Sequence, residues 1–293
     1  MKLICKVNVN TLLTIYSEQF KTIFFMKKLL LTASVAGLLL FNSCSTVPLT
    51  GRSRLNLVGN DQVLPMAFQA YSEFLTENKT AVLPASNAQA LKVKTIGSRL
   101  ITAVQTYMNN NNYGNLIQDY KWEVNVVQNN EKNAWCMPGG KIVVYTGILP
   151  VTQDDAGLAT VMGHEIAHAI AGHSAERMSQ EMVAQGIGTA GGVALSKNPK
   201  AQSTFNTLYG VGAPIAMLKY SRNQELEADR LGLIFMAMAG YNPQSSVSFW
   251  NRMASASANA QKPAEFLSTH PSDATRIAQI QKYLPEAQQY YKK

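Results

Sequence analysis

The 293-residue sequence has few cysteines, few histidines and no cluster of basic residues. Cys5 and Cys44 lie near the N-terminus, so Cys136 stands alone in the rest of the chain and no internal disulfide is expected there. Five lysines and one glutamate precede position 44, which lowers the net charge from +8 for the whole chain to +4 for residues 44–293. This mild, dispersed excess gives little support for a nucleic-acid partner.

The first part of the chain reads as a targeting signal. Lys27 and Lys28 precede an apolar run, 29–41, and Cys44 follows it. The run is shorter than the ~20 residues that a membrane-spanning helix needs. The order is similar to a lipoprotein signal over 26–43, in which Cys44 is lipidated and tethers the protein to a membrane. A plain secretory signal or an N-terminal anchor is the alternative.

We interpret residues 1–25 as a non-native extension upstream of a credible start at Met26. Residues 44–60 are polar and contain Pro48 and Gly51, so they are predicted to form a tether. The remaining 61–293 are enough for a single domain with a proper core, and no repeat of fixed period interrupts them.

The hydrophobic pattern predicts an α+β fold, mostly helical with a small sheet. Trp122, Val124 and Val126 alternate with polar residues as in a strand, and a Pro-Gly-Gly turn at 138–140 indicates a hairpin. Thr152 is expected to cap the long helix that follows it. Glycine-rich 186–192 predicts a flexible connection or a short buried helix. The predicted helices cover 61–78, 87–110, 152–185, 223–238, 245–258 and 272–289.

The long predicted helix carries the segment His164-Glu165-Ile166-Ala167-His168. Residues four apart share a face of a helix, so the two imidazoles can close on one zinc ion. Glu165, next to the first imidazole, is placed to act as a general base. An ordinary helix surface is the alternative, but the apolar and small residues around the motif favour a buried metal site.

A catalytic zinc takes three protein ligands and keeps one open position. The third ligand is open between His173, His270, Cys136 and a downstream carboxylate. His173, five residues beyond His168, is rotated off the ligand face of a continuous helix. Glu225 is favoured: it shares a face with Asp229 on a later helix, where one carboxylate can bind zinc and the other can orient a histidine. A solvated acidic face is the alternative.

These motifs resemble the gluzincin zinc proteases of the HtpX and CAAX prenyl protease family, in particular the exported peptidases of the BepA and LoiP type. The resemblance extends over most of the chain after position 44. It is carried by TVPLTGR, NAWCMPGGK, HEIAH, YSRNQELEADR, AGYNP and FLSTHPS.

The resemblance implies a zincin-like metalloprotease domain with one Zn²⁺ per chain. It assigns His164, His168 and Glu225 as zinc ligands, Glu165 as the catalytic base and Asp229 as a carboxylate behind a ligand.

It also implies that Asn133, Ala134, Trp135 and Cys136 form an edge strand to which an extended peptide adds by backbone hydrogen bonds. His270 would stabilise the oxyanion or occupy the open metal position, and Arg276 is a candidate for the same negative charge. A structural hairpin, a loop histidine and a surface arginine are the alternatives.

The resemblance leads us to expect a zinc endopeptidase that hydrolyses misfolded or unassembled cell-envelope proteins. Its partners would be unfolded polypeptides and, through the lipid on Cys44, a membrane. We expect it to be exported and to face the periplasm, on the outer membrane. Two other functions stay open: a zinc-containing chaperone or assembly factor that rarely cleaves, and a zinc amidase that acts on cell-wall peptides.

Overall fold

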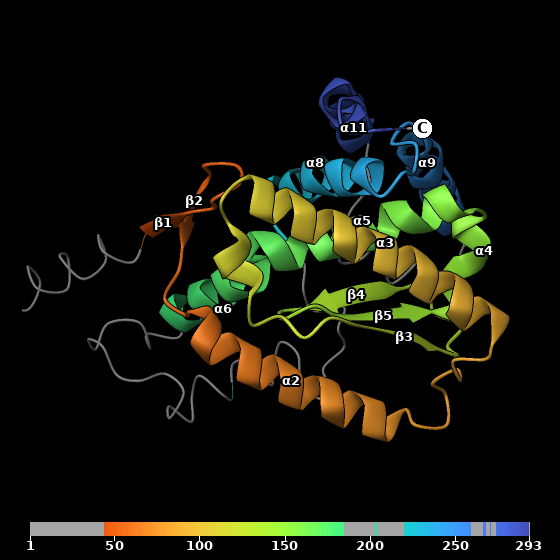
Figure 1. Ribbon diagram of the computed structural model, residues 1–293, viewed down its shortest axis with the longest axis horizontal. Helices are drawn as coiled ribbons and strands as arrows, with labels where there is room; N and C mark the ends of the chain where they lie inside the picture. The colour runs from red at the N-terminus through yellow and green to blue at the C-terminus, as the bar shows by residue number, and fades with distance from the viewer. Residues whose placement is uncertain are drawn as a thin grey trace, which may run out of the picture.

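The computed structural model describes residues 44–184, 203, 220–258, 266–267, 270 and 274–292. The predicted extension (1–25), signal (26–43) and glycine-rich connection (186–192) lie outside these residues. The predicted α+β fold is confirmed, because the described chain is mostly helix around a small sheet (Figure 1).

Most predicted helices lie within two residues of their observed bounds. The described helices of three or more turns are α2 (Asn60–Glu77), α3 (Ala88–Asn110), α5 (Asp155–Ala171), α6 (His173–Ala184), α8 (Arg222–Met238), α9 (Ser245–Ala258) and α11 (Ala274–Gln288).

The three-stranded sheet has the order β3-β5-β4. Strand β5 (Lys141–Tyr145) lies in the centre, parallel to β3 (Glu123–Val127) and antiparallel to β4 (Ala134–Met137). The predicted hairpin therefore joins β4 to β5, and its Gly139 and Gly140 have φ of 83° and 81°, which side chains disfavour. Among the described residues β4 pairs only with β5, so β4 is an edge strand.

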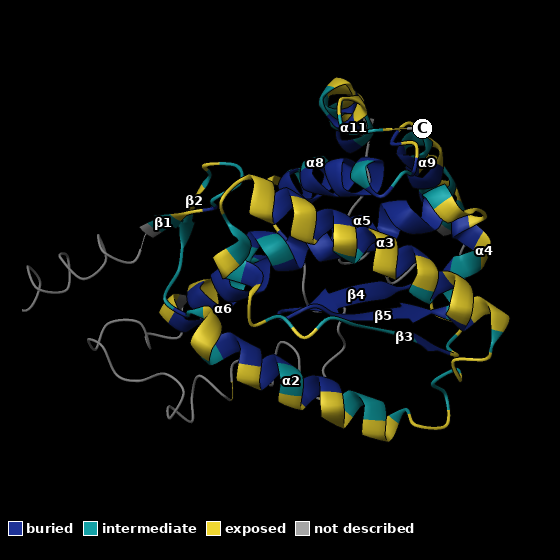
Figure 2. Ribbon diagram, in the orientation of Figure 1, coloured by how far each residue is buried: buried dark blue, intermediate teal, exposed yellow. Residues whose placement is uncertain are grey.

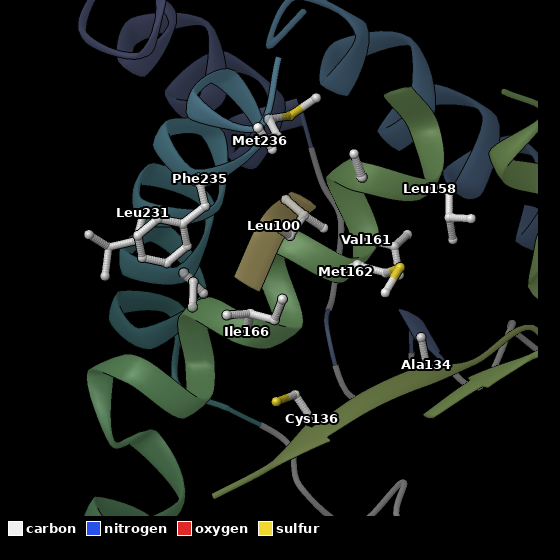
Figure 3. Close-up of a cluster of buried hydrophobic side chains, with 14 of the residues drawn as sticks. Leu100, Ala134, Cys136, Leu158, Val161, Met162, Ile166, Leu231, Phe235 and Met236 are labelled. Atoms are coloured by element: carbon white, nitrogen blue, oxygen red, sulfur yellow. The ribbon is translucent and has the colours of Figure 1, made fainter. Parts of the chain in front are cut away.

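Helices cover both faces of the sheet (Figures 1 and 2). Helix α2 lies on one face, where Trp135 stacks edge-on against Tyr71 and Phe74. Helices α3 and α5 lie on the other face, and Cys136 packs there in the main core with Ile166 of α5 (Figure 3). Successive residues of β4 thus enter different cores, as the two-residue period of a strand requires.

The prediction of one continuous helix over 152–185 is wrong, because three helices occupy most of this range and the residues just before it. A short helix α4 (Leu149–Thr152) ends before α5, and Asp154, not Thr152, caps α5 by accepting a hydrogen bond from Gly157 N at 2.7 Å. Gly172 then ends α5 with φ of 70°, the left-handed conformation typical of a helix C-terminus. Helix α6 therefore starts at His173 in a new direction.

The prediction of a tether over 44–60 is also wrong for the described residues. Strands β1 (Cys44–Thr46) and β2 (Ser53–Leu55) pair antiparallel, and Val47 and Val58 are buried. Leu57 N donates to Ser179 Oγ of α6 at 2.9 Å. The segment 44–58, called here the N-terminal hairpin, is part of the folded domain.

None of the helices in the described ranges combines the length and hydropathy that crossing a membrane demands.

Candidate metal centre

Helix α5 carries the predicted motif through the middle of the domain. His164, Glu165 and His168 are only 1%, 4% and 1% exposed. The helix is buried on nearly all sides (Figure 2), which explains its small and apolar composition. Polar groups buried this deeply need partners, and the structure supplies them from α8, α6 and α11.

A glycine pair sets the distance between α5 and α8. A Cβ on Gly232 of α8 would lie 2.9 Å from His164 N, and one on Gly163 would lie 3.0 Å from Gly232 O. Leu231 and Phe235 of α8 belong to the same buried cluster as Ile166 of α5 (Figure 3). The close approach brings the Glu225 and Asp229 carboxylates of α8 to the histidines of α5.

Replacing Gly232 by alanine is therefore expected to push the two helices apart. The new Cβ meets backbone, which cannot rotate away, and overpacking of this kind costs about 1–3 kcal/mol. We expect a lower unfolding temperature without metal and a weaker affinity for Zn²⁺, measured by thermal unfolding and by competition with a chromophoric chelator. Wild-type values for both would contradict the proposed role of the glycine crossing.

Four donor groups converge between these helices. His164 Nε2 lies 3.0 Å from His168 Nε2 and 3.5 Å from Glu225 Oε2. The family resemblance led us to expect His270 near the metal site. Its Nδ1 lies 3.2 Å from His164 Nε2 and 2.8 Å from Glu225 Oε1. One ligand atom from each of the four residues lies within 4.8 Å of the others. Cys136 and His173, the other candidates for a third ligand, are not in this group.

The donor set fits zinc. Two ligands at about 2.0–2.1 Å from a tetrahedral zinc lie roughly 3.3 Å apart, close to the separations among these atoms. The Nδ1 atoms of His164 and His168 are hydrogen-bonded elsewhere, so their Nε2 atoms face each other with lone pairs available. Two such lone pairs at 3.0 Å repel unless a cation or a proton lies between them. The centre can therefore hold one metal ion.

Asp229 contacts His164 directly. Its Oδ1 accepts a hydrogen bond from His164 Nδ1 at 2.9 Å. Arg276 of α11 donates to both carboxylate oxygens of Asp229, at 2.7 and 2.8 Å, and lies 2.9 Å from Glu225 Oε2. Its guanidinium stacks 3.6 Å from the centre of the Trp250 ring. Arg276 is thus buried behind the donor atoms rather than exposed on the surface.

The charges of the centre depend on each other. Burial opposes a proton on His164, but its hydrogen bonds to Asp229 and Glu225 raise its pKa to about 9. Burial lowers the pKa of His168 well below its usual value. Burial also opposes the charge of Glu225, but His270 and Arg276 hold the pKa of that carboxyl well below its usual range. These shifts favour the charged form of His164 over that of His168 in the protein without metal, and a metal ion would compete with that proton.

His168 is supported by a residue that the sequence analysis rejected as a ligand. His173 Nδ1 lies 2.7 Å from His168 Nδ1, and His173 Nε2 lies 2.8 Å from Glu227 Oε2. Gly172 makes this possible, since the turn between α5 and α6 brings His173 back over His168. The sequence analysis disfavoured His173 as a zinc ligand, and the structure places it outside the converging donors. Because a continuous helix was assumed, the contact of His173 with His168 Nδ1 was missed.

Glu227 was also missed, because on an ideal helix it points away from Glu225. Its partners come from the N-terminal hairpin: Thr50 Oγ1 donates to Oε1 and Arg52 Nε to Oε2. Burial opposes its charge, but hydrogen bonds from His173, Thr50 and Arg52 lower the pKa of Glu227 to about 2. No local pattern in the sequence links T-G-R at 50–52 with E-L-E at 225–227, because the two segments lie more than 170 residues apart.

Glu165 lies beside the four converging donors but is not one of them. Its Oε1 lies 3.4 Å from His270 Nε2 and, among the described residues, accepts no hydrogen bond. Burial raises the pKa of Glu165, although electrostatic interactions with the two neighbouring histidines oppose this. The acid is thus a better proton acceptor than an exposed glutamate.

The predicted edge-strand residues lie beside this group on β4. Ala134 and Cys136 pack in the main core beside α5 (Figure 3). Trp135 enters the other core, under α2. Asn133 is buried, and its side chain accepts a hydrogen bond from Ala134 N at 2.9 Å. These side chains are therefore held in place, and what the strand offers to a partner is its backbone.

Comparisons with known proteins agree with this geometry. The model of peptidase family M48 matches residues 87–284, which contain every donor of the centre. The chain belongs to peptidase family M48. With this membership the predicted enzyme class and cofactor are confirmed: the protein is a zinc metalloendopeptidase.

Two groups of relatives match the chain to different extents. The mitochondrial metalloendopeptidase OMA1 of Schizosaccharomyces pombe is 34% identical over 86% of this chain and 70% of its own length. The human OMA1 protein is 30% identical over 89% of this chain, which spans 50% of that protein. The beta-barrel assembly-enhancing protease of Escherichia coli is 28% identical over 52% of this chain and 32% of its own length. The resemblance to the family is confirmed, but the OMA1 proteins match more of the chain than the BepA type does.

The predicted location is wrong. Relatives that cover most of the chain, from fission yeast, budding yeast and human, are named as mitochondrial proteins, not as lipoproteins that face the periplasm. Lipidation of Cys44 is tested by neither the structure nor the relatives and stays a prediction.

Proposed function

We propose that this protein cleaves misfolded or unassembled proteins of membranes or of the cell envelope. The observation that carries the proposal is the convergence of His164, His168 and Glu225 beside Glu165 and a strand edge. The relatives named as OMA1 endopeptidases and as beta-barrel assembly-enhancing proteases support the substrate class.

In this proposal His164, His168 and Glu225 hold the zinc ion. Zinc would supply a Lewis acid that polarises the scissile carbonyl and makes water more acidic. Glu165 is buried, and among the described residues its Oε1 accepts no hydrogen bond; this carboxyl takes the proton of the attacking water and delivers it to the leaving nitrogen. Asp229 keeps the hydrogen on His164 Nδ1, so that Nε2 presents its lone pair.

The substrate is an extended chain that adds to β4. In the described residues this strand has one free edge, and it packs against α5, so a peptide added along it runs past the donor atoms. Backbone pairing of this kind favours unfolded segments and selects few side chains. Substrates defined by their unfolded state, rather than by a sequence, follow from this recognition.

His270 is proposed to act at the reacting atoms, whereas Arg276, buried behind the donor atoms, holds the carboxylates of Asp229 and Glu225. With His270 included, four protein donors fill a tetrahedral site, which leaves no open position. We expect His270→Ala to keep zinc, because three ligands remain, and to change turnover. Slower peptide cleavage would identify His270 as an oxyanion contact, and faster cleavage as an occupant of the open position. Unchanged turnover would contradict both roles.

The function is tested with a membrane protein offered in folded and in heat-unfolded form. The zinc-loaded full chain is expected to cleave the unfolded form, to stop on addition of 1,10-phenanthroline and to recover with added Zn²⁺. Binding of the unfolded chain without cleavage would favour the chaperone or assembly factor instead. Release of peptides from purified peptidoglycan would favour the amidase.

A further inference from the structure

A buried chain of polar contacts joins the N-terminal hairpin to the metal centre. Arg52 Nε donates to Glu227 Oε2 at 2.7 Å, and the same oxygen lies 2.8 Å from His173 Nε2. His173 Nδ1 in turn lies 2.7 Å from His168 Nδ1. Two residues, Glu227 and His173, thus separate the guanidinium of Arg52 from the imidazole of His168, which faces the metal site.

Glu227 fixes the direction of the hydrogen bonds in this chain of contacts. The carboxylate of Glu227 can only accept, so His173 Nε2 carries the hydrogen between them. A neutral His173 then has a lone pair on Nδ1 and accepts from His168 Nδ1. His168 Nε2 is left without hydrogen and can bind a metal. If His173 donated instead, His168 would carry its hydrogen on Nε2 and could not bind.

Each zinc histidine thus has a carboxylate behind it that an arginine holds. Asp229 contacts His164 directly, and Arg276 donates to both of its oxygens. Glu227 contacts His168 through His173, and Arg52 takes the place of Arg276. The contacts behind His168 include one more imidazole, that of His173, than those behind His164. Arg52 comes from the N-terminal part of the chain, whereas Arg276 comes from the C-terminal part.

Arg52 also joins two helices that meet at the centre. Its Nη1 and Nη2 donate to the two oxygens of Glu176 on α6, at 2.9 and 2.7 Å. Glu176 Oε2 also accepts from Gln224 Nε2 of α8 at 3.0 Å. The side chains of Glu176 and Glu227 are 6% and 4% exposed and that of Arg52 is 23% exposed, so the ion pairs are largely shielded from water. A bidentate arginine in this setting holds a fixed geometry.

We propose that Arg52 and Thr50 are positioning residues of the metal centre, which fix the orientation and tautomer of His168 through Glu227 and His173. The proposal rests on the zinc centre proposed above. Outer partners of zinc ligands typically change metal affinity by about 10–100-fold. The N-terminal hairpin would accordingly be part of the working enzyme, and its displacement would weaken zinc binding.

The test is a zinc titration of the metal-free full chain against a chromophoric chelator. Arg52→Met is expected to weaken zinc binding by about 10–100-fold. Arg230→Met is the matched control, since it removes another bidentate arginine–glutamate pair, with Glu286, that starts on α8. We expect a change of less than about twofold for it. The visible spectrum of the Co²⁺ form should shift in Arg52→Met and not in the control.

The route through His173 is tested by combining changes. His173→Asn is designed to keep an acceptor near His168 Nδ1 but to lose Glu227. In that background Arg52→Met should have no further effect on zinc affinity. If Arg52→Met weakens binding equally in both backgrounds, or in neither, the proposal is overturned.

Two further results of the zinc titration also decide the proposal. If Arg52→Met does not fold, Glu227→Gln replaces it in the same pair of titrations, and the same results decide. If the wild-type chain binds no zinc, the metal centre itself is wrong. A wild type that binds one zinc, with Arg52→Met of equal affinity, rejects only the positioning role.

Discussion

Replacing Glu165 by glutamine is expected to abolish peptide cleavage and to leave zinc binding intact. Glu165 is not among the converging donors, and the amide cannot take a proton at neutral pH. General base catalysis contributes about 10²–10⁴-fold, which is the loss expected in kcat/KM. The variant should fold, because burial already disfavours the charge of this carboxyl. Initial cleavage rates and zinc content by mass spectrometry measure both effects.

Glu131→Gln serves as the control. Glu131 is exposed in the loop that precedes β4. It is not one of the converging donors. Its cleavage rate should equal that of the wild type. Cleavage by Glu165→Gln at a wild-type rate would reject the proposed base and favour another residue.

The second large effect is expected from Glu225→Gln, which removes the charged third ligand. A neutral amide binds zinc less well, and Arg276 loses the carboxylate that faces it at 2.9 Å. Zinc affinity should fall by more than the ~10–100-fold typical of an outer partner. Chelator competition measures the affinity.

Asp229→Asn provides the comparison, since Asp229 contacts His164 from outside the donor group and should show the smaller loss. A Glu225→Gln variant that keeps wild-type zinc affinity would contradict the assignment. The third ligand would then be His270, which lies in the same donor group.

The local parts of the site could be predicted from the sequence. His164, Glu165 and His168 lie within one turn, so helix geometry alone places them together. Glu225 and Asp229 are likewise one turn apart on α8, so helix geometry places them on one face. The structure adds only the contact between α5 and α8. The glycine pair that makes this contact is visible in the sequence, but nothing there says that Gly163 and Gly232 meet.

The rest depended on tertiary contacts between distant segments. The N-terminal hairpin was predicted as a tether because its composition is polar, yet its polar residues Thr50 and Arg52 are the ones that bind Glu227. Likewise His173 was judged from a continuous helix that Gly172 ends. The first prediction failed because a buried partner far away in the chain, Glu227, decided the structure. The second failed because Gly172 interrupts the helix on which it was based.

The central claim is that one zinc ion is held by His164, His168 and Glu225. An anomalous difference map, recorded at the zinc absorption edge from crystals of the zinc-loaded protein, tests it most directly. We predict a single strong peak at about 2.0–2.2 Å from Nε2 of both histidines and from a carboxylate oxygen of Glu225. No peak between α5 and α8, or a peak bound by other residues, would contradict the account.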